Sequence, residues 1–176
     1  MDRRPIALIG LMGAGKSAVA RLLGERLGAS MADLDAMVEA AEGRAVAEIF
    51  ARAGEEHFRR RESELLTEVL RTGVRVLACG GGIVLDPENR RALREHCRVV
   101  WLEVSPAEAA RRVSAAGAPA AERPLLAGDG PCERLAALLA ARTPLYEETA
   151  HLRVDTDGLA PADVVARILA PESPAR

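Results

Sequence analysis

The stretch Gly10-Leu11-Met12-Gly13-Ala14-Gly15-Lys16-Ser17 fits the G-x-x-x-x-G-K-[ST] pattern of a phosphate-binding loop. Lys16 is the only lysine among the 24 lysine and arginine residues of this 176-residue chain. Arginine is a poor substitute where a compact ammonium must fit between phosphate oxygens, because its planar guanidinium is larger. The position of the one lysine therefore favours a phosphate site over a glycine-rich turn with an exposed lysine.

The segments that flank this loop are those that a phosphate-binding loop requires. Residues 6–9 form a short apolar run that predicts a buried parallel strand, and residues 16–27 predict a helix that ends at Gly28. Backbone N–H groups and the helix N-terminus would then surround a polyphosphate, with Lys16 at the β- and γ-phosphates and the Ser17 hydroxyl on Mg²⁺. The residues expected at the nucleotide phosphates are Gly13, Ala14, Gly15, Lys16, Ser17 and Ala18.

Composition places the chain among ordinary globular proteins of one domain, here residues 1–176. The net charge of -2 argues against a general nucleic-acid or membrane surface, and the apolar stretch after Arg3-Arg4 is better explained by the phosphate loop than by a signal peptide. Three cysteines without C-x-x-C spacing indicate reduced thiols rather than disulfides or a metal site. We therefore expect a cytoplasmic protein that acts on small molecules, and we expect a monomer.

Strand and helix signals alternate along the chain, which predicts a parallel sheet covered by helices on both faces. The predicted strands are 6–9, 30–32, 75–79, 98–102 and 151–154. The predicted helices after 16–27 are 34–41, 46–52, 55–71, 87–95, 106–114, 131–149 and 161–169. Residues 117–131 are rich in Gly, Pro and Ala around Arg123 and predict either a plain surface loop or a lid, and residues 171–176 predict a frayed tail.

Two motifs are expected at the carboxyl ends of strands, where ligands of such sheets gather. Asp33-Leu34-Asp35 follows the second strand, and its carboxylates could hold Mg²⁺ or accept a proton from an attacking hydroxyl. The alternative is that one of them only caps the next helix. Gly80-Gly81-Gly82 closes the third strand, and three consecutive glycines favour close approach of the backbone to a ligand over a simple turn.

Arginines outside these motifs are individually unremarkable. Arg59-Arg60-Arg61-Glu62 lies on a predicted helix, so at most one or two of the arginines can face one site. A solvated helix face with pairs such as Arg59–Glu62 is the usual explanation. The same holds for Arg112 and Arg142 when each is considered alone.

Taken together, these motifs resemble those of shikimate kinases along nearly the whole chain. The shared elements are the phosphate loop, Asp33-x-Asp35, Gly54-Glu-Glu-His-Phe58-Arg59 with Glu62, Gly80-Gly81-Gly82, Arg123-Pro-Leu-Leu and Arg142-x-Pro-Leu-Tyr146. The resemblance implies an α/β P-loop fold of the nucleoside-monophosphate-kinase type, with a five-stranded parallel sheet in the order 2-3-1-4-5 and a lid. It also implies Mg²⁺-dependent transfer of phosphate from ATP to the 3-hydroxyl of shikimate, a step in the biosynthesis of chorismate and the aromatic amino acids.

The resemblance assigns roles to particular residues. Shikimate would be held by Asp35, Arg59, Gly80, Gly81, Gly82 and Arg142, with the two arginines on its carboxylate. Lys16, Asp35 and Arg123 would be catalytic, and Ser17 and Asp33 would serve Mg²⁺. Arg112 and the segment that contains Pro161 would flank adenine, and Arg123 would reach the ATP phosphates from the lid.

Two other functions remain open at this point. Another small-molecule kinase of the same fold, such as a gluconate kinase, is disfavoured by the glycine triplet and the arginine motifs. A nucleotide-dependent switch or binding module without catalysis is disfavoured because Lys16, Asp33, Asp35 and Arg123 are all present. A GTPase would also need a second lysine in its guanine-reading motif, and this chain has none.

Overall fold

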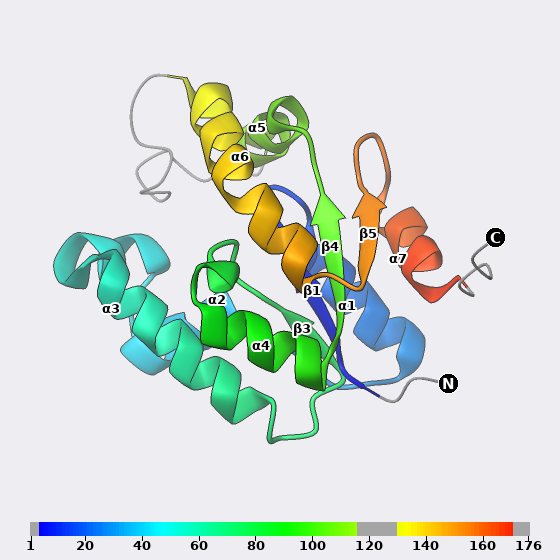
Figure 1. Ribbon diagram of the computed structural model, residues 1–176, viewed down its shortest axis with the longest axis horizontal. Helices are drawn as coiled ribbons and strands as arrows, with labels where there is room; N and C mark the ends of the chain where they lie inside the picture. Colours follow the sequence, from blue (N-terminus) through cyan, green and yellow to red (C-terminus); the bar gives the residue numbers. More distant parts are fainter. Residues whose placement is uncertain (1–3, 116–129, 171–176) are drawn as a thin grey trace.

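Five parallel strands form one sheet in the order β2-β3-β1-β4-β5, which confirms the predicted order. The structure, a computed structural model, describes residues 4–115 and 130–170 (Figure 1). The strands are β1 (Ile6–Ile9), β2 (Met31–Asp33), β3 (Val76–Ala78), β4 (Arg98–Glu103) and β5 (Leu152–Asp155). β1 lies in the centre, where Ile6 pairs with Val76 of β3 and Arg98 of β4, and all four of its residues are buried.

Helices cover both faces of this sheet, as the alternation of strands and helices predicts. They are α1 (Lys16–Leu27), α2 (Leu34–Glu42), α3 (Val46–Val69), the 3₁₀ turn η1 (Ile83–Leu85), α4 (Pro87–His96), α5 (Pro106–Ala115), α6 (Pro131–Thr149) and α7 (Pro161–Leu169). α1 and α7 pack on one face through a core that includes Leu23 and Ile168. α3 and α4 lie on the other face, where Phe58 of α3 and Leu93 of α4 belong to the second core cluster (Figure 1). Both faces of β1 are therefore buried.

Proline and glycine set most of the helix boundaries. Pro87, Pro106, Pro131 and Pro161 each open a helix where the sequence predicts one, because proline fits the first turn without losing a hydrogen bond. The helices predicted at 46–52 and 55–71 form one element, α3, which is interrupted at Gly54 (φ 83°, ψ 168°). The break is thus where the sequence places it, although the two segments adjoin without a connecting loop.

Most predicted boundaries agree with the structure within one or two residues, and the differences that bear on the site concern β2 and β3. β2 ends at Asp33 instead of residue 32, so this carboxylate belongs to the strand end itself. β3 is shorter than 75–79, and the turn η1 after the glycine triplet is not predicted. The predicted lid at 117–131 and tail at 171–176 lie almost entirely outside the described residues, with only Gly130 and Pro131 at the start of α6 inside them.

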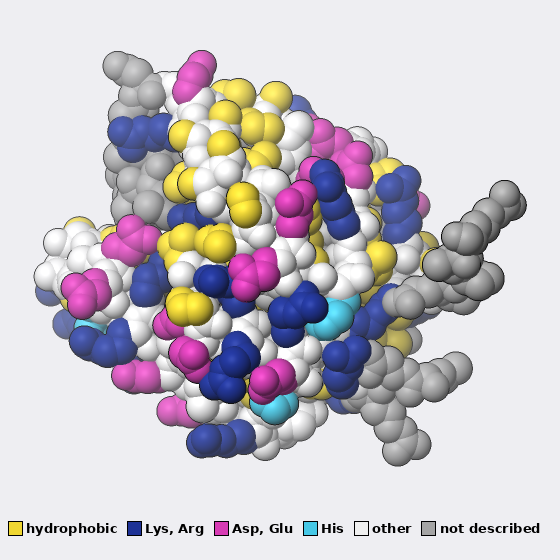
Figure 2. Space-filling model, viewed as in Figure 1, with side chains coloured by type: hydrophobic (Ala, Val, Ile, Leu, Met, Phe, Trp, Pro, Cys, Tyr) yellow, Lys and Arg dark blue, Asp and Glu magenta, His cyan; other side chains and the backbone are white. Residues whose placement is uncertain are grey.

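Acidic and basic side chains are interspersed on the face of the molecule that Figure 2 shows. Among the described residues, many charged side chains form local pairs on one helix, such as Arg91 with Glu88 and Arg21 with Glu25. The charged surface therefore offers no extended patch of one sign on this face.

Among the described helices, none has the length and apolar character that crossing a membrane requires.

Candidate active site

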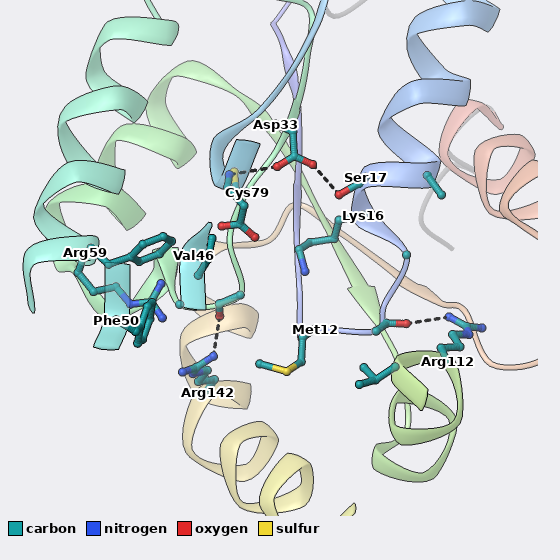
Figure 3. A pocket seen from close by; sticks show the side chains of 18 residues that line it. Met12, Lys16, Ser17, Asp33, Val46, Phe50, Arg59, Cys79, Arg112 and Arg142 are labelled. Carbon is teal, nitrogen blue, oxygen red and sulfur yellow. Dashed lines mark hydrogen bonds between the residues drawn. The ribbon is translucent and has the colours of Figure 1, made fainter. Parts of the chain in front are cut away.

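A pocket of about 540 Å³ opens at the carboxyl ends of β1, β2 and β3. Twelve of the predicted site residues line it: Gly13, Gly15, Lys16, Ser17, Ala18, Asp33, Asp35, Arg59, Gly81, Gly82, Arg112 and Arg142. Arg59 and Phe50 lie on one side of the pocket and Arg112 on the opposite side, with Lys16 between them (Figure 3). The fold thus brings together residues that are more than 120 positions apart in the sequence.

Four predicted site residues are not part of this lining. Ala14 is buried within the phosphate loop, and Gly80 lies behind Gly81 against the carboxylates of Glu62 and Asp35. Pro161 is exposed at the start of α7, and Arg123 lies outside the described residues. Six further residues line the pocket: Met12, Val46, Phe50, Phe58, Cys79 and Val113. None of them was predicted as a site residue, because an apolar side chain alone does not indicate a ligand.

The phosphate loop is held by two glycines that touch neighbouring backbone. Gly10 (φ 138°) lies so close to Leu102 that a Cβ atom would overlap its carbonyl oxygen. Gly13 (φ 82°) would place a Cβ atom 2.8 Å from the carbonyl oxygen of Ala109. α1 then starts with Gly15 as its N-cap and with no side-chain cap, so its first N–H groups remain available to an anion.

Lys16 curls back over the loop. Its Nζ donates to the carbonyl oxygens of Gly10 (2.9 Å) and Leu11 (3.0 Å). Burial lowers the pKa of Lys16, and the nearby carboxylates of Asp35 and Asp33 oppose that effect. The ammonium therefore lies between the phosphate loop and the acidic pair.

Asp33 caps a helix and also contacts the phosphate loop. Its Oδ1 accepts from the backbone N–H groups of Asp35 (3.1 Å) and Ala36 (3.4 Å) at the start of α2. Its Oδ2 accepts from Ser17 Oγ at 2.5 Å (Figure 3). The cap that the sequence offers as an alternative for this residue is therefore confirmed, whereas its role at Mg²⁺ stays a prediction that the contact with Ser17 supports.

Asp35 faces the pocket from the first turn of α2 and is half-buried. Burial raises its pKa above the ordinary value of 3.8, while the positive charge of Lys16 works in the opposite direction. A carboxylate with a raised pKa next to a cation is suited to accept a proton from a hydroxyl group.

The glycine triplet makes room for side chains as well as for a ligand. A Cβ atom on Gly80 would lie 2.7 Å from Asp35 Oδ1 and would overlap the carboxylate of Glu62. A Cβ atom on Gly82 would lie 2.5 and 2.6 Å from the terminal nitrogens of Arg59. Each glycine therefore lets a charged side chain lie directly on the backbone of the β3–η1 turn.

Gly81, the middle glycine, accepts two hydrogen bonds at its carbonyl oxygen. The donors are Tyr146 Oη (2.6 Å) and one terminal nitrogen of Arg142 (3.1 Å). Both side chains come from α6 and are buried, and burial raises the pKa of Tyr146 to about 12, so its hydroxyl stays a donor at neutral pH. This pair of bonds fixes the guanidinium of Arg142 at the edge of the pocket.

Arg59 reaches the pocket from α3, and its neighbour Arg60 does not. The guanidinium of Arg59 lies 5.9 Å from the ring centre of Phe50 and 5.2 Å from that of Phe58, and it forms a 2.8 Å ion pair with Glu62. Arg60 is exposed and contacts His57. The Arg59–Glu62 pair that the sequence predicts is present, but it is not on a solvated helix face: Arg59 lines the pocket and Glu62 is buried.

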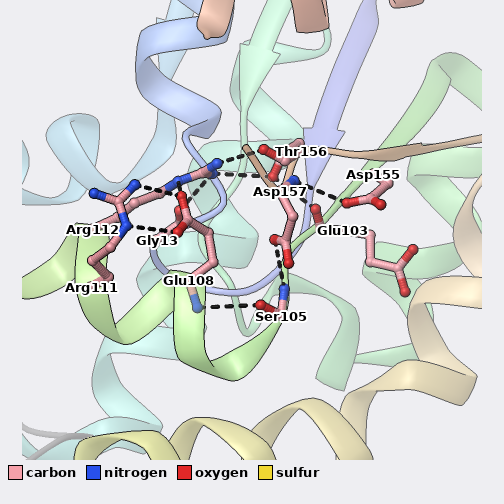
Figure 4. Close-up of polar contacts among 9 residues, drawn as sticks. All are labelled: Gly13, Glu103, Ser105, Glu108, Arg111, Arg112, Asp155, Thr156 and Asp157. Carbon is pink, nitrogen blue, oxygen red and sulfur yellow. Dashed lines mark hydrogen bonds and ion pairs between the residues drawn. The ribbon is translucent and has the colours of Figure 1, made fainter. Parts of the chain in front are cut away.

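Arg112 connects α5 to the phosphate loop and to the segment that follows β5 (Figure 4). Its Nε lies 2.7 Å from Glu108 Oε1 on α5, and one terminal nitrogen donates to the carbonyl oxygen of Gly13 (3.3 Å) and to Thr156 Oγ1 (3.1 Å). Hydrogen bonds from Arg111 and Arg112 lower the pKa of Glu108 to about 2. No sequence signal marks Glu108 or Thr156, because these contacts arise only after folding.

Comparison with known proteins finds chains and structures similar to this one. The family model described as Shikimate kinase matches residues 12–171. A shikimate kinase from Symbiobacterium thermophilum is 51% identical over 164 residues, which cover 93% of each chain. The structure of a shikimate kinase from Acinetobacter baumannii in complex with shikimate has a TM-score of 0.88 and 37% identity, and covers 94% of this chain and 90% of that one.

A more distant likeness concerns the fold alone. A gluconokinase from Sinorhizobium meliloti has a TM-score of 0.62 at 20% identity, with 95% of this chain and 90% of that chain covered.

The sheet order, the phosphate loop and the paired arginines occur in a chain that the family model matches over most of its length. On these grounds the chain belongs to the shikimate kinase family.

Proposed function

We propose that this protein transfers the γ-phosphoryl group of ATP to the 3-hydroxyl of shikimate. The observation that carries the proposal is that two arginines, Arg59 and Arg142, reach the same pocket as the phosphate loop and Asp35. Shikimate is a small polyhydroxylated carboxylate, so its site needs cations for the carboxylate and an acceptor for the proton of the reacting hydroxyl.

The acceptor half of the pocket would hold shikimate between charged groups. Arg59 and Arg142 would donate to its carboxylate, while Asp35 would accept a hydrogen bond from a ring hydroxyl. As the oxygen of that hydroxyl bonds to the γ-phosphorus and the bond to the ADP oxygen breaks, the proton would pass to Asp35. Val46, Phe50 and Phe58 line this side and would help exclude water, which competes with the hydroxyl for the phosphoryl group.

The nucleotide half would hold ATP on the phosphate loop. The N–H groups from Gly13 to Ala18 would bind the phosphates, and Lys16 would neutralise charge that develops on the transferring group. The guanidinium of Arg112, anchored by Glu108 and Thr156, would lie against adenine. We keep Pro161 and Arg123 in the adenine and phosphate roles that the family resemblance assigns to them.

Mg²⁺ fits the oxygen atoms of Ser17 and Asp33, which lie 2.5 Å apart beside the phosphate loop. Hydroxyl and carboxylate oxygens suit this hard cation, which usually keeps several waters and takes further ligands from phosphates. Within residues 4–115 and 130–170, no group of three His, Cys, Asp or Glu side chains that could hold a metal occurs. When bound, Mg²⁺ would neutralise charge on the β- and γ-phosphates.

We further propose a cytoplasmic monomer that binds neither nucleic acid nor membranes. The net charge of -2 and the mixed surface charges support this, as do the three free cysteines at positions 79, 97 and 132. Light scattering after size-exclusion chromatography would test the oligomeric state, and a mass of twice 18.7 kDa would contradict it.

A substrate panel tests the proposed reaction. The purified protein would be given ATP and Mg²⁺ with shikimate, gluconate or a nucleoside monophosphate, and formation of ADP would be followed by a coupled assay. We expect the highest kcat/KM with shikimate, and Arg142→Ala should weaken shikimate binding while Arg60→Ala, the exposed control, should not. Faster turnover of gluconate or of a nucleoside monophosphate would overturn the proposal.

A further inference from the structure

Arg59 is already paired with two carboxylates of its own helix. Glu62 Oε2 accepts from one terminal nitrogen at 2.8 Å. Glu55 Oε1 accepts from Nε at 3.2 Å and from the other terminal nitrogen at 3.1 Å. The three nitrogens of the guanidinium that the proposed function assigns to the substrate carboxylate therefore each have a carboxylate partner.

The two partners differ in how easily they can leave. The side chain of Glu62 is 1% exposed, whereas that of Glu55 is 44% exposed. Glu62 would remain a buried, unpaired carboxylate if it lost Arg59, which is strongly unfavourable. Glu55 can turn into solvent by side-chain rotation alone, because it is bound to Arg59 only as a local i,i+4 pair.

A substrate carboxylate, which the proposed function also pairs with Arg142, would be the third negatively charged group around Arg59. In a pocket that is partly shielded from water, this arrangement is unfavourable unless one of the charges withdraws. The substrate carboxylate and Glu55 therefore compete for the positive charge of Arg59, and Glu55 is the one whose departure leaves no buried group without a partner.

We propose that Glu55 occupies the place of the substrate carboxylate in the free protein and is displaced when a carboxylate ligand binds. This inference rests on the proposed function, since it takes shikimate as the ligand of Arg59. Glu55 then keeps Arg59 extended toward the pocket while the pocket is empty, and lowers affinity for every carboxylate ligand, including the phosphorylated product, which must leave.

Two substitutions test this role. Glu55→Gln removes the charge and Glu55→Ala removes the competing group, and both lie at an exposed position where the fold should tolerate them. An exposed ion pair of this kind predicts that the Kd for shikimate, measured by calorimetry, falls by about two- to fivefold. Glu64→Gln is the matched control, because Glu64 is 45% exposed on the same helix but pairs with Arg61 instead of Arg59.

The methyl ester of shikimate separates competition from other effects. It lacks the carboxylate, so its Kd should be the same in the wild-type protein and in Glu55→Ala. An unchanged or higher Kd for shikimate in Glu55→Ala would overturn the inference, and a higher Kd would show that Glu55 only orients Arg59. Shikimate turnover by the wild-type protein keeps the proposed function standing in that case, whereas its absence would overturn both.

Discussion

Gly82→Ala is expected to disable the substrate site through the side chain of Arg59. Gly82 has φ -103° and ψ 3°, a conformation open to alanine, so the backbone itself does not resist the change. The added Cβ atom would lie 2.5 and 2.6 Å from the two terminal nitrogens of Arg59, where ordinary contact begins at 3.4 Å. The guanidinium must therefore shift by about an ångström, which is enough to break a directed hydrogen bond.

The size of the effect follows from the bond that is lost. A hydrogen bond to a charged group contributes about 1.5–3 kcal/mol, which corresponds to a rise of about ten- to a hundredfold in the Kd for shikimate. ATP affinity should stay near that of the wild type, because Gly82 and Arg59 lie on the acceptor side of the pocket. Calorimetry with each ligand gives both values, and a thermal melt shows whether the variant is folded.

A double-mutant cycle shows whether Arg59 carries the effect. If Gly82→Ala acts only by displacing Arg59, it should add little to the loss caused by Arg59→Ala, so the two effects should be strongly non-additive. Additive losses in the double variant would refute this reasoning, and so would wild-type affinity for shikimate in Gly82→Ala alone.

Three further predictions concern the phosphate loop, the acid–base group and the glycine turn. Lys16→Arg should keep the fold but lose most turnover in the coupled assay, because the larger fork does not fit the place of the ammonium; near-wild-type activity would contradict this. Burial raises the pKa of Asp35 above 3.8, and only the ionised carboxylate can accept the proton of the hydroxyl. The value of kcat/KM should therefore fall as the pH is lowered through that raised pKa. A fall in kcat/KM that begins only at or below pH 3.8 would exclude this role. Tyr146→Phe removes the 2.6 Å hydrogen bond to Gly81 and should lower the free energy of unfolding by about 1 kcal/mol, measured by urea unfolding with the fluorescence of the single tryptophan. An unchanged urea midpoint would show that the hydrogen bond from Arg142 alone is enough to hold the turn.

Much of the fold could be predicted from the positions of proline and glycine and from the periodicity of apolar residues. Prolines at helix starts, Gly54 between two helical segments and the buried run at residues 6–9 act locally, so their structural meaning is legible in the sequence. The strand boundaries at Asp33 and Val76 were less accurate, because hydrogen bonding with the neighbouring strand decides where a strand ends.

The candidate site was predictable where several polar residues cluster in the chain, and less so elsewhere. Helical periodicity does not say which of Arg59 and Arg60 faces inward; packing against Phe50 and Phe58 decides it. The sequence indicates only in part why three consecutive glycines occur here, because the side chains that lie against them, Glu62 and Arg59, come from α3. The anchoring of Arg112 by Thr156, which is 44 positions away, had no sequence signal at all.

The most direct test of the account is a crystal structure of the protein with shikimate, ADP and Mg²⁺. The account predicts the shikimate carboxylate within hydrogen-bonding distance of both Arg59 and Arg142, a ring hydroxyl on Asp35, and the ADP phosphates on the N–H groups of the phosphate loop. Shikimate bound outside this pocket, or bound with its carboxylate turned away from both arginines, would contradict the central claim.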